Sequence, residues 1–354
     1  MTREINPLES VPEGIGKTQE KGQEEITRLL NRSEGQFSPE LQKTLEKIDF
    51  AKLRQLFLDI ALRFGIYEDD LNFLDKKRIF GSAVRSVDSY YDLENNIIMI
   101  TQDKANISHY EARLKLKDNT GLVGDEKMLE VLNREKKAMI ETYGSVDLST
   151  LQTLVHEEVH AISKHICKSL YEQNVDKWTD VWLRVHQSGY RRNNIYKKQL
   201  NAEFYPAPLM ESEKFLKVFM VLNEAVVEKL AREIMLKYLE NSGWPREEAS
   251  VFEETVKNKS KPLSYAREVY LLEAIIKKLS QKTKKSEESV WQIFIKGLLE
   301  GEKFDRPEER KIFEKNFSPN FLKELSNLST WPSWHSKRHE SIEELKAFME
   351  RYKL

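Results

Sequence analysis

The sequence predicts an α+β fold that is mostly helical. Glycine is sparse, with 13 residues in 354, and long stretches rich in Lys, Glu and Leu are typical of helices. Apolar residues recur at steps of three and four over much of the chain, which is the spacing of one helix face. Residues 78–101 break this pattern, because their aromatic and β-branched side chains indicate a hairpin or two short strands.

The N-terminal part of the chain divides into regions of different character. Residues 1–38 are polar and rich in Glu, Gly and Gln, so we expect a disordered tail there. Residues 39–75 follow as a helical segment, because apolar side chains keep helical spacing up to Phe64. The strands expected within 78–101 open a core region that we place at 76–280, and a helix is expected near 126–143.

The most informative helix is expected to begin near Asp147. The stretch DLSTLQTLVHEEVHAISKHI has the pattern of one amphipathic helix, with Ser149 and Gln152 as a capping box at its start. Its apolar stripe consists of Leu151, Val155, Val159, Ile162 and Ile166.

The rest of the chain alternates between an irregular region and further helices. Residues 186–206 have an irregular or strand-like pattern, and a second strong helix is expected at roughly 213–240. Helices are also expected at 262–282 and 286–300. We therefore expect a helical C-terminal region over 281–354.

Composition narrows the possible partners and compartment. The formal net charge is -1, so no overall basic surface attracts nucleic acid. No apolar run approaches the length of a bilayer span, and the first residues lack the apolar stretch of a signal peptide. The single cysteine, Cys167, excludes a disulfide framework within the chain. We expect a soluble cytoplasmic protein with no membrane or nucleic-acid partner; its oligomeric state is left open.

The motif that carries chemistry is H-E-x-x-H, formed by His156-Glu157-Glu158-Val159-His160. Residues four apart lie one above the other on a helix, so two imidazoles there can reach one ion about 2 Å away. Glu157 lies at the edge of that face, where it can take a proton from water activated by the ion. The chain has only 7 histidines, which makes a chance match rare. We therefore expect a zinc site with Glu157 as the general base.

A catalytic zinc needs a third protein ligand, and the nearby histidines fit this role poorly. In the longer pattern H-E-x-x-H-x-x-G-x-x-H, Ser163 replaces the glycine and Ile166 replaces the third histidine. His165 lies five residues after His160 and so points away from the metal-binding face.

Glu224 is the stronger candidate for the third ligand. It interrupts a nearly apolar run in KFLKVFMVLNEAVVEKLAREI, and a carboxylate among apolar side chains needs a cation or another partner. Glu228 follows one turn later, where it could accept a hydrogen bond from the free ring nitrogen of a zinc-ligating histidine. Solvated glutamates on an ordinary helix remain the alternative.

The pair HEEVH and downstream NEAVVE resembles the gluzincin group of zinc metallopeptidases, whose best-known member is thermolysin. The resemblance implies that His156, His160 and Glu224 bind zinc and that Glu157 is the general base. It further implies that Glu228 and Asn223 support the ligands. The gap from His160 to Glu224 is longer than in thermolysin, and the chain also resembles leaderless bacterial gluzincin-like proteins.

The resemblance also implies a fold for the region 76–280. It is a zincin-like catalytic core, in which a small mixed sheet lies over the H-E-x-x-H helix. The stretch NNIIMI fits the edge strand of that sheet, and SGYRRNN to NAEFYP fits a hairpin between the two helices. By the same resemblance Tyr265 is the first candidate for stabilising the oxyanion, with Tyr190 and His186 as alternatives.

Three functions compete at this point. The first is a metallopeptidase that cleaves a peptide or protein substrate. The second is a catalytically latent regulatory protein that keeps the zincin fold and acts through a partner. The third is a structural zinc site, which a chain with one cysteine supports poorly. Near the C-terminus, His335 and His339 are expected on a solvated tail, and Trp331 and Trp334 could form a self-inhibitory segment.

Overall fold

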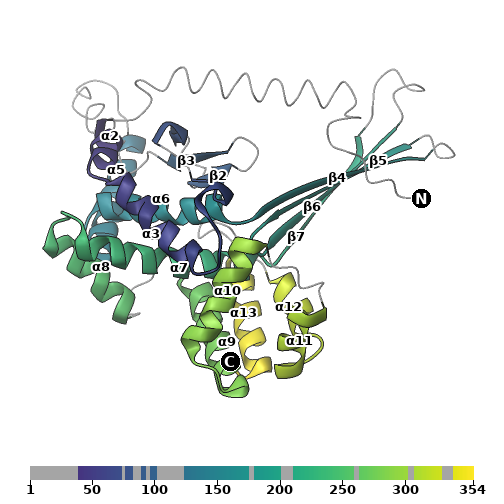
Figure 1. Ribbon diagram of the computed structural model, residues 1–354. Helices are drawn as coiled ribbons and strands as arrows, with labels where there is room; N and C mark the ends of the chain where they lie inside the picture. Colours follow the sequence, from purple (N-terminus) through teal and green to yellow (C-terminus); the bar gives the residue numbers. More distant parts are fainter. Residues whose placement is uncertain are drawn as a thin grey trace. The chain divides into compact units, whose positions relative to one another are not determined.

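The computed structural model describes residues 39–73, 76–82, 89–92, 96–101, 123–174, 179–200, 210–258, 263–301, 307–328 and 338–354. Over these ranges the protein is mostly helical and carries one small mixed sheet and one antiparallel sheet, so the α+β prediction is confirmed at this level (Figure 1). The tail expected at 1–38 lies outside the described residues, as do Trp331, Trp334 and His335.

The chain divides into two compact units, which we describe separately. The helix unit holds the described residues up to Ile162 together with Glu228–Ala266. The meander unit holds Ser163–Val227 and Arg267–Leu354. Helix α7, Met220–Asn241, is one uninterrupted helix whose first part belongs to the meander unit and whose second part belongs to the helix unit.

The helix unit contains five complete helices in addition to the second part of α7 and two 3-10 turns. The helices and turns are α2 Pro39–Glu46, α3 Phe50–Leu62, η1 Glu68–Asp70, η2 Lys76–Arg78, α5 Val123–Tyr143, α6 Val146–Ile162 and α8 Arg246–Asn258. The strands are β1 Ile79–Ser82, β2 Tyr90–Asp92 and β3 Ile97–Thr101. Asp49 caps α3 by accepting the Lys52 backbone N–H at 3.0 Å, which satisfies a donor that the first helical turn leaves free.

The small sheet has the strand order β1-β3-β2, with β1 parallel and β2 antiparallel to β3. The NNIIMI stretch, which forms β3, is therefore the central strand, and the expectation that it forms an edge is wrong. Its isoleucines Ile97, Ile98 and Ile100 are buried, as the middle of a sheet requires. The edge strands of the described sheet are β1 and β2, and β2 and β3 both contact helix α6 (Figure 1).

Helix α6 starts earlier and ends earlier than its sequence pattern suggested. Its first turn is capped by Ser145, whose Oγ accepts the Leu148 backbone N–H at 3.1 Å. Ser149 and Gln152 are buried inside the helix and do not form the expected capping box. The helix ends at Ile162, so Ile166 lies in a strand.

The meander unit is built on four antiparallel strands in the order β4-β5-β6-β7. They are β4 His165–Asn174, β5 Thr179–Ser188, β6 Arg191–Leu200 and β7 Met210–Val218. The strand-like pattern predicted for 186–206 is confirmed over β6 and the end of β5. The helix expected from about residue 213 is wrong up to Val218, because these residues pair with β6 and the helix begins only at Met220.

Five further helices belong largely to the meander unit. They are α9 Ala266–Thr283, α10 Glu287–Glu300, α11 Pro307–Asn316, α12 Phe321–Asn327 and α13 Arg338–Tyr352. Their apolar faces meet in a core that includes Trp291, Phe294, Phe313, Phe321 and Phe348. Helices α9 and α10 confirm the helices expected at 262–282 and 286–300, and α11, α12 and α13 follow them in the described ranges. No helix in the described part of the chain is both long enough and apolar enough to cross a bilayer.

Candidate metal centre

Helix α6 carries the H-E-x-x-H residues in the arrangement that helical spacing predicts. His156 and His160 lie one turn apart, with their ring centroids separated by 5.0 Å. His156 is buried and His160 is partly exposed, and Glu157 beside them is also buried. Because this placement depends only on 3.6 residues per turn, it follows from the sequence once the segment is helical.

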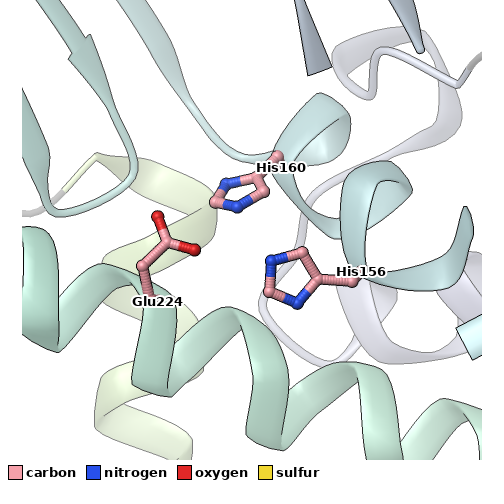
Figure 2. A group of neighbouring side chains, drawn as sticks. All are labelled: His156, His160 and Glu224. Carbon is pink, nitrogen blue, oxygen red and sulfur yellow. The ribbon is translucent and has the colours of Figure 1, made fainter. Parts of the chain in front are cut away.

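Glu224 joins the two histidines from helix α7. His156, His160 and Glu224 each offer one possible ligand atom, and these atoms all lie within 4.8 Å of one another. Figure 2 shows the Glu224 carboxylate and a nitrogen of each imidazole turned toward a common space. Glu224 is only 4% exposed. The structure thus brings together all three residues predicted as metal ligands.

Glu228 lies one turn after Glu224 on α7 and contacts His156 directly. Its Oε2 lies 2.9 Å from His156 Nδ1, and the Glu228 carboxylate is 1% exposed. An ionised carboxylate in this position would accept a hydrogen bond from a protonated Nδ1, which would leave Nε2 available to an ion. Glu228 therefore occupies the supporting place that the sequence predicted for it.

Two further side chains contact Glu228: Arg232, which has no role in the sequence-based predictions, and Gln152, which was expected in a capping box instead. Glu228 Oε1 accepts hydrogen bonds from Arg232 Nε at 2.8 Å and from Gln152 Nε2 at 3.3 Å. Arg232 follows Glu228 by four residues on α7, a spacing typical of an acid–base pair on one helix face, so this contact was detectable in the sequence. The Gln152 contact joins two helices and was not.

Glu157 is positioned by strand β2. Its Oε2 accepts the backbone N–H of Tyr91 at 2.8 Å. In the register of the sheet Tyr91 is opposite Ile98, and its N–H bonds to Glu157. The edge strand and the proposed base are thus tied by one hydrogen bond, which the sequence did not reveal.

The side chain of Tyr91 fixes β2 in turn. Its hydroxyl accepts from Asn72 Nδ2 at 3.0 Å and donates to Asn96 Oδ1 at 2.8 Å. Asn72 also donates to the Ala161 carbonyl near the end of α6, at 3.3 Å. We call Asn72, Tyr91 and Asn96 the β2 latch, because these side chains connect the edge strand to the helix that carries the motif.

Tyr265 lies against the first histidine. Its ring stacks on the His156 ring with a centroid distance of 5.2 Å and an interplanar angle of 8°. The residue is 37% exposed and has a φ of 51°, in the left-handed region that side chains other than glycine rarely adopt. Strained backbone conformations of this kind cluster at functional sites, so Tyr265 is a candidate functional residue and not only a packing residue.

The alternatives to Tyr265 are placed differently. The hydroxyl of Tyr190 is buried and donates to the Phe294 carbonyl at 3.1 Å. The side chain of His186 lies outside the described residues. His165, which was weighed as a third metal ligand, begins strand β4. Tyr265 is therefore the candidate that the described contacts bring to the metal-binding residues.

Asn223 is buried and supports a turn. Its Oδ1 accepts the backbone N–H groups of Tyr190 at 3.0 Å and Arg191 at 3.2 Å, at the bend between β5 and β6. At this bend Gly189 has a φ of 55°, and a Cβ there would lie 2.9 Å from Asn223 Oδ1. These two hydrogen bonds of Asn223 anchor the β5–β6 turn next to Glu224.

The donor set fits a zinc ion. Two imidazoles and one carboxylate are a usual set for catalytic zinc, with a fourth position left for water or substrate. Ligands about 2.1 Å from one ion lie roughly 3.4 Å apart in tetrahedral geometry. The three possible ligand atoms, which lie within 4.8 Å of one another, would need to approach each other by at most roughly 1.5 Å to reach this spacing. Among the described residues this is the group of His, Cys, Asp and Glu side chains that could hold a metal ion.

The negative charge of Glu228 also affects the phenol of Tyr143. Burial raises the pKa of Tyr143, and repulsion from the Glu228 carboxylate raises it further. Tyr143 therefore stays protonated beside the site at neutral pH, and its hydroxyl lies 3.3 Å from Ser264 Oγ.

Comparison with known proteins finds no relative of this chain. No protein-family model matches the chain, no curated protein matches it, and no solved structure matches it.

Proposed function

We propose that this protein is a zinc-dependent metallopeptidase that hydrolyses peptide bonds with Glu157 as the general base. The observation that carries the proposal is the His156, His160 and Glu224 cluster, with ligand atoms within 4.8 Å of one another and Glu157 beside it. The donor set is that of hydrolytic zinc sites, and H-E-x-x-H places the carboxylate next to the ligands.

We further propose that the fold around this centre is zincin-like and of the gluzincin type. A small mixed sheet has its edge strand β2 against α6, and the third ligand comes from a separate helix, α7. The order of elements agrees with the resemblance carried by HEEVH and NEAVVE. We place the protein in the cytoplasm, because its single cysteine is typical of a reducing compartment.

The residues of the chain have distinct tasks in this proposal. When bound, zinc supplies a Lewis acid that makes water acidic and polarises a carbonyl group. Glu157 accepts the proton of the attacking water on its carboxylate and passes it to the departing amine. Glu228 keeps the His156 proton on Nδ1, so that Nε2 stays available to the ion. The Tyr265 hydroxyl is the proposed donor to the developing oxyanion.

The decisive experiment compares the wild type with Glu157→Gln. Zinc content and cleavage of a mixed peptide library are measured on the same preparations. Glu158→Gln is the matched control, because it removes a similarly buried carboxylate from the next position of the same helix. We expect Glu157→Gln to keep its zinc and to lose cleavage by about 100- to 10,000-fold, while Glu158→Gln keeps both.

The outcomes separate the two candidate functions. Zinc bound by every variant with no cleavage by the wild type would favour the catalytically latent regulatory protein. A wild type that binds no divalent ion would overturn the metal site itself. Equal cleavage by the wild type and Glu157→Gln would remove the proposed base.

A further inference from the structure

One face of helix α7 carries three charged residues at successive turns: Glu224, Glu228 and Arg232. The first is a predicted ligand and the second holds His156, but the third has no role in the proposed chemistry. Its side chain is 12% exposed, and a charged side chain this far withdrawn from water usually has specific acceptors. The contacts of Arg232 indicate its role.

Arg232 connects two segments that both contact His156. Its Nε donates to Glu228 Oε1 at 2.8 Å, while Glu228 Oε2 lies 2.9 Å from His156 Nδ1. Its Nη2 donates to the Ser264 carbonyl at 2.6 Å. Ser264 directly precedes Tyr265, whose ring stacks on His156. These contacts form a closed circuit that begins and ends at the His156 imidazole.

The Ser264–Tyr265 turn needs such an anchor. Tyr265 has a φ of 51°, a conformation that costs an L-residue roughly 1 kcal/mol and persists only where its surroundings impose it. The contacts at the turn include the backbone hydrogen bond from Ala266 N–H to the Leu263 carbonyl at 3.2 Å, and two side-chain contacts at Ser264: the Arg232 hydrogen bond to its carbonyl and the contact of Tyr143 with its Oγ. Of the two side-chain contacts, the Arg232 bond is charge-assisted and short, so it is the stronger.

We propose that Arg232 is a positioning residue for the metal centre. It fixes the Glu228 carboxylate and the Tyr265 turn together, and so holds the His156 ring between them with its proton on Nδ1. Its planar guanidinium reaches both acceptors at once, which the single ammonium of lysine does less well. Its positive charge also offsets one of the two α7 carboxylates, which lie one turn apart and repel each other. This inference rests on the proposed metal centre but does not require peptidase activity.

The test compares Arg232→Met and Arg232→Lys with the wild type. Lys229→Met is the matched control, because Lys229 lies on the same helix, is 22% exposed and pairs with Glu233 at 2.8 Å. The zinc dissociation constant is measured by competition with a chromophoric chelator. The visible absorption of the cobalt-substituted protein reports the ligand geometry. Far-UV circular dichroism and thermal unfolding show whether each variant is folded.

We expect Arg232→Met to weaken zinc binding by about 10- to 100-fold and to change the cobalt spectrum, as loss of a ligand's supporting partner typically does. Arg232→Lys should recover part of the affinity, because it keeps the charge but not both hydrogen bonds. Lys229→Met should match the wild type in both measurements. If Arg232→Met and Lys229→Met give the same affinity and the same spectrum, Arg232 does not position the centre.

A second measurement works without metal. In protein labelled with ¹⁵N at histidine, long-range ¹H–¹⁵N spectra of the metal-free form distinguish the two neutral tautomers of each ring. We expect His156 to carry its proton on Nδ1 in the wild type and to show a mixture in Arg232→Met. An unchanged tautomer would contradict the inference even if the protein bound no zinc. If the wild type shows the expected tautomer and zinc affinity but cleaves no peptide, the result counts against the proposed function and not against the role of Arg232.

Discussion

Tyr265 shows at the scale of one residue how backbone strain and side-chain placement are linked. Its φ of 51° would suit glycine, yet a large aromatic residue stands there and covers one face of the His156 ring. A stable position would not retain this conformation without a compensating contact. The stacking therefore offsets the strain, and the two contributions can be separated by substitution.

We expect Tyr265→Gly to be more stable than Tyr265→Ala by about 1 kcal/mol, because glycine relieves the left-handed strain and alanine does not. Both variants lose the stacked ring. By the proposed mechanism, their catalytic turnover should fall strongly while their zinc content changes less. The measurement is urea unfolding combined with steady-state kinetics. Lys284 has a φ of 57° and is exposed, so the same pair of substitutions there should reproduce the stability difference with unchanged kinetics. Equal stability of the two Tyr265 variants would show that the backbone is not strained.

At the scale of elements, the contact between strand β2 and helix α6 matters most. β2 has three residues and pairs with one neighbour, so its own ladder cannot fix its position firmly. The β2 latch supplies what the ladder lacks, and the Tyr91 N–H then reaches Glu157. The edge strand β2 thus supports the Glu157 carboxylate.

Tyr91→Phe tests the latch, because it removes the hydroxyl but keeps the backbone N–H that contacts Glu157. We expect a loss of about 1 kcal/mol in the free energy of unfolding, since Asn72 and Asn96 lose a shared partner. Turnover should fall while zinc content stays unchanged, because the ligands are not touched. Tyr90→Phe, at an exposed neighbouring position, is the control and should have a smaller effect on both. A Tyr91→Phe variant whose turnover equals that of the wild type would show that the latch does not position Glu157.

At the scale of the whole molecule, the metal centre would couple binding to stability. Its ligands come from α6 and α7, so an ion can be held only while both helices are in place. A ligand that binds the folded state alone stabilises it by mass action.

Adding zinc to the chelator-treated protein should therefore raise its melting temperature. At a free zinc concentration 100 times the dissociation constant, the expected gain is about 2.7 kcal/mol. Differential scanning calorimetry with and without zinc measures the gain. In Glu224→Gln the gain should largely disappear, whatever that substitution does to the metal-free protein. A zinc-dependent shift that persists undiminished in Glu224→Gln would place the ion elsewhere.

The places where the sequence prediction failed share a cause. Residues from about 213 to Val218 and Ile166 fit a helical apolar pattern, yet both lie in strands that pair with neighbours along the meander. Periodicity in a short window cannot separate a helix end from a strand, because pairing depends on residues outside the window. The start of α6 was misplaced for a related reason, since Ser145 and Ser149 are both acceptable caps and the structure uses the earlier one.

By itself the sequence determined the class of the fold and the geometry of His156, Glu157 and His160. Both follow from local rules: helical periodicity fixes which side chains share a face, and imidazoles four residues apart can bind one ion. The tertiary structure alone decided that the Tyr91 N–H meets Glu157, that Tyr265 stacks on His156, and that Gln152 reaches Glu228. These contacts join segments far apart in the chain, and their formation depends on how whole elements pack rather than on any local spacing.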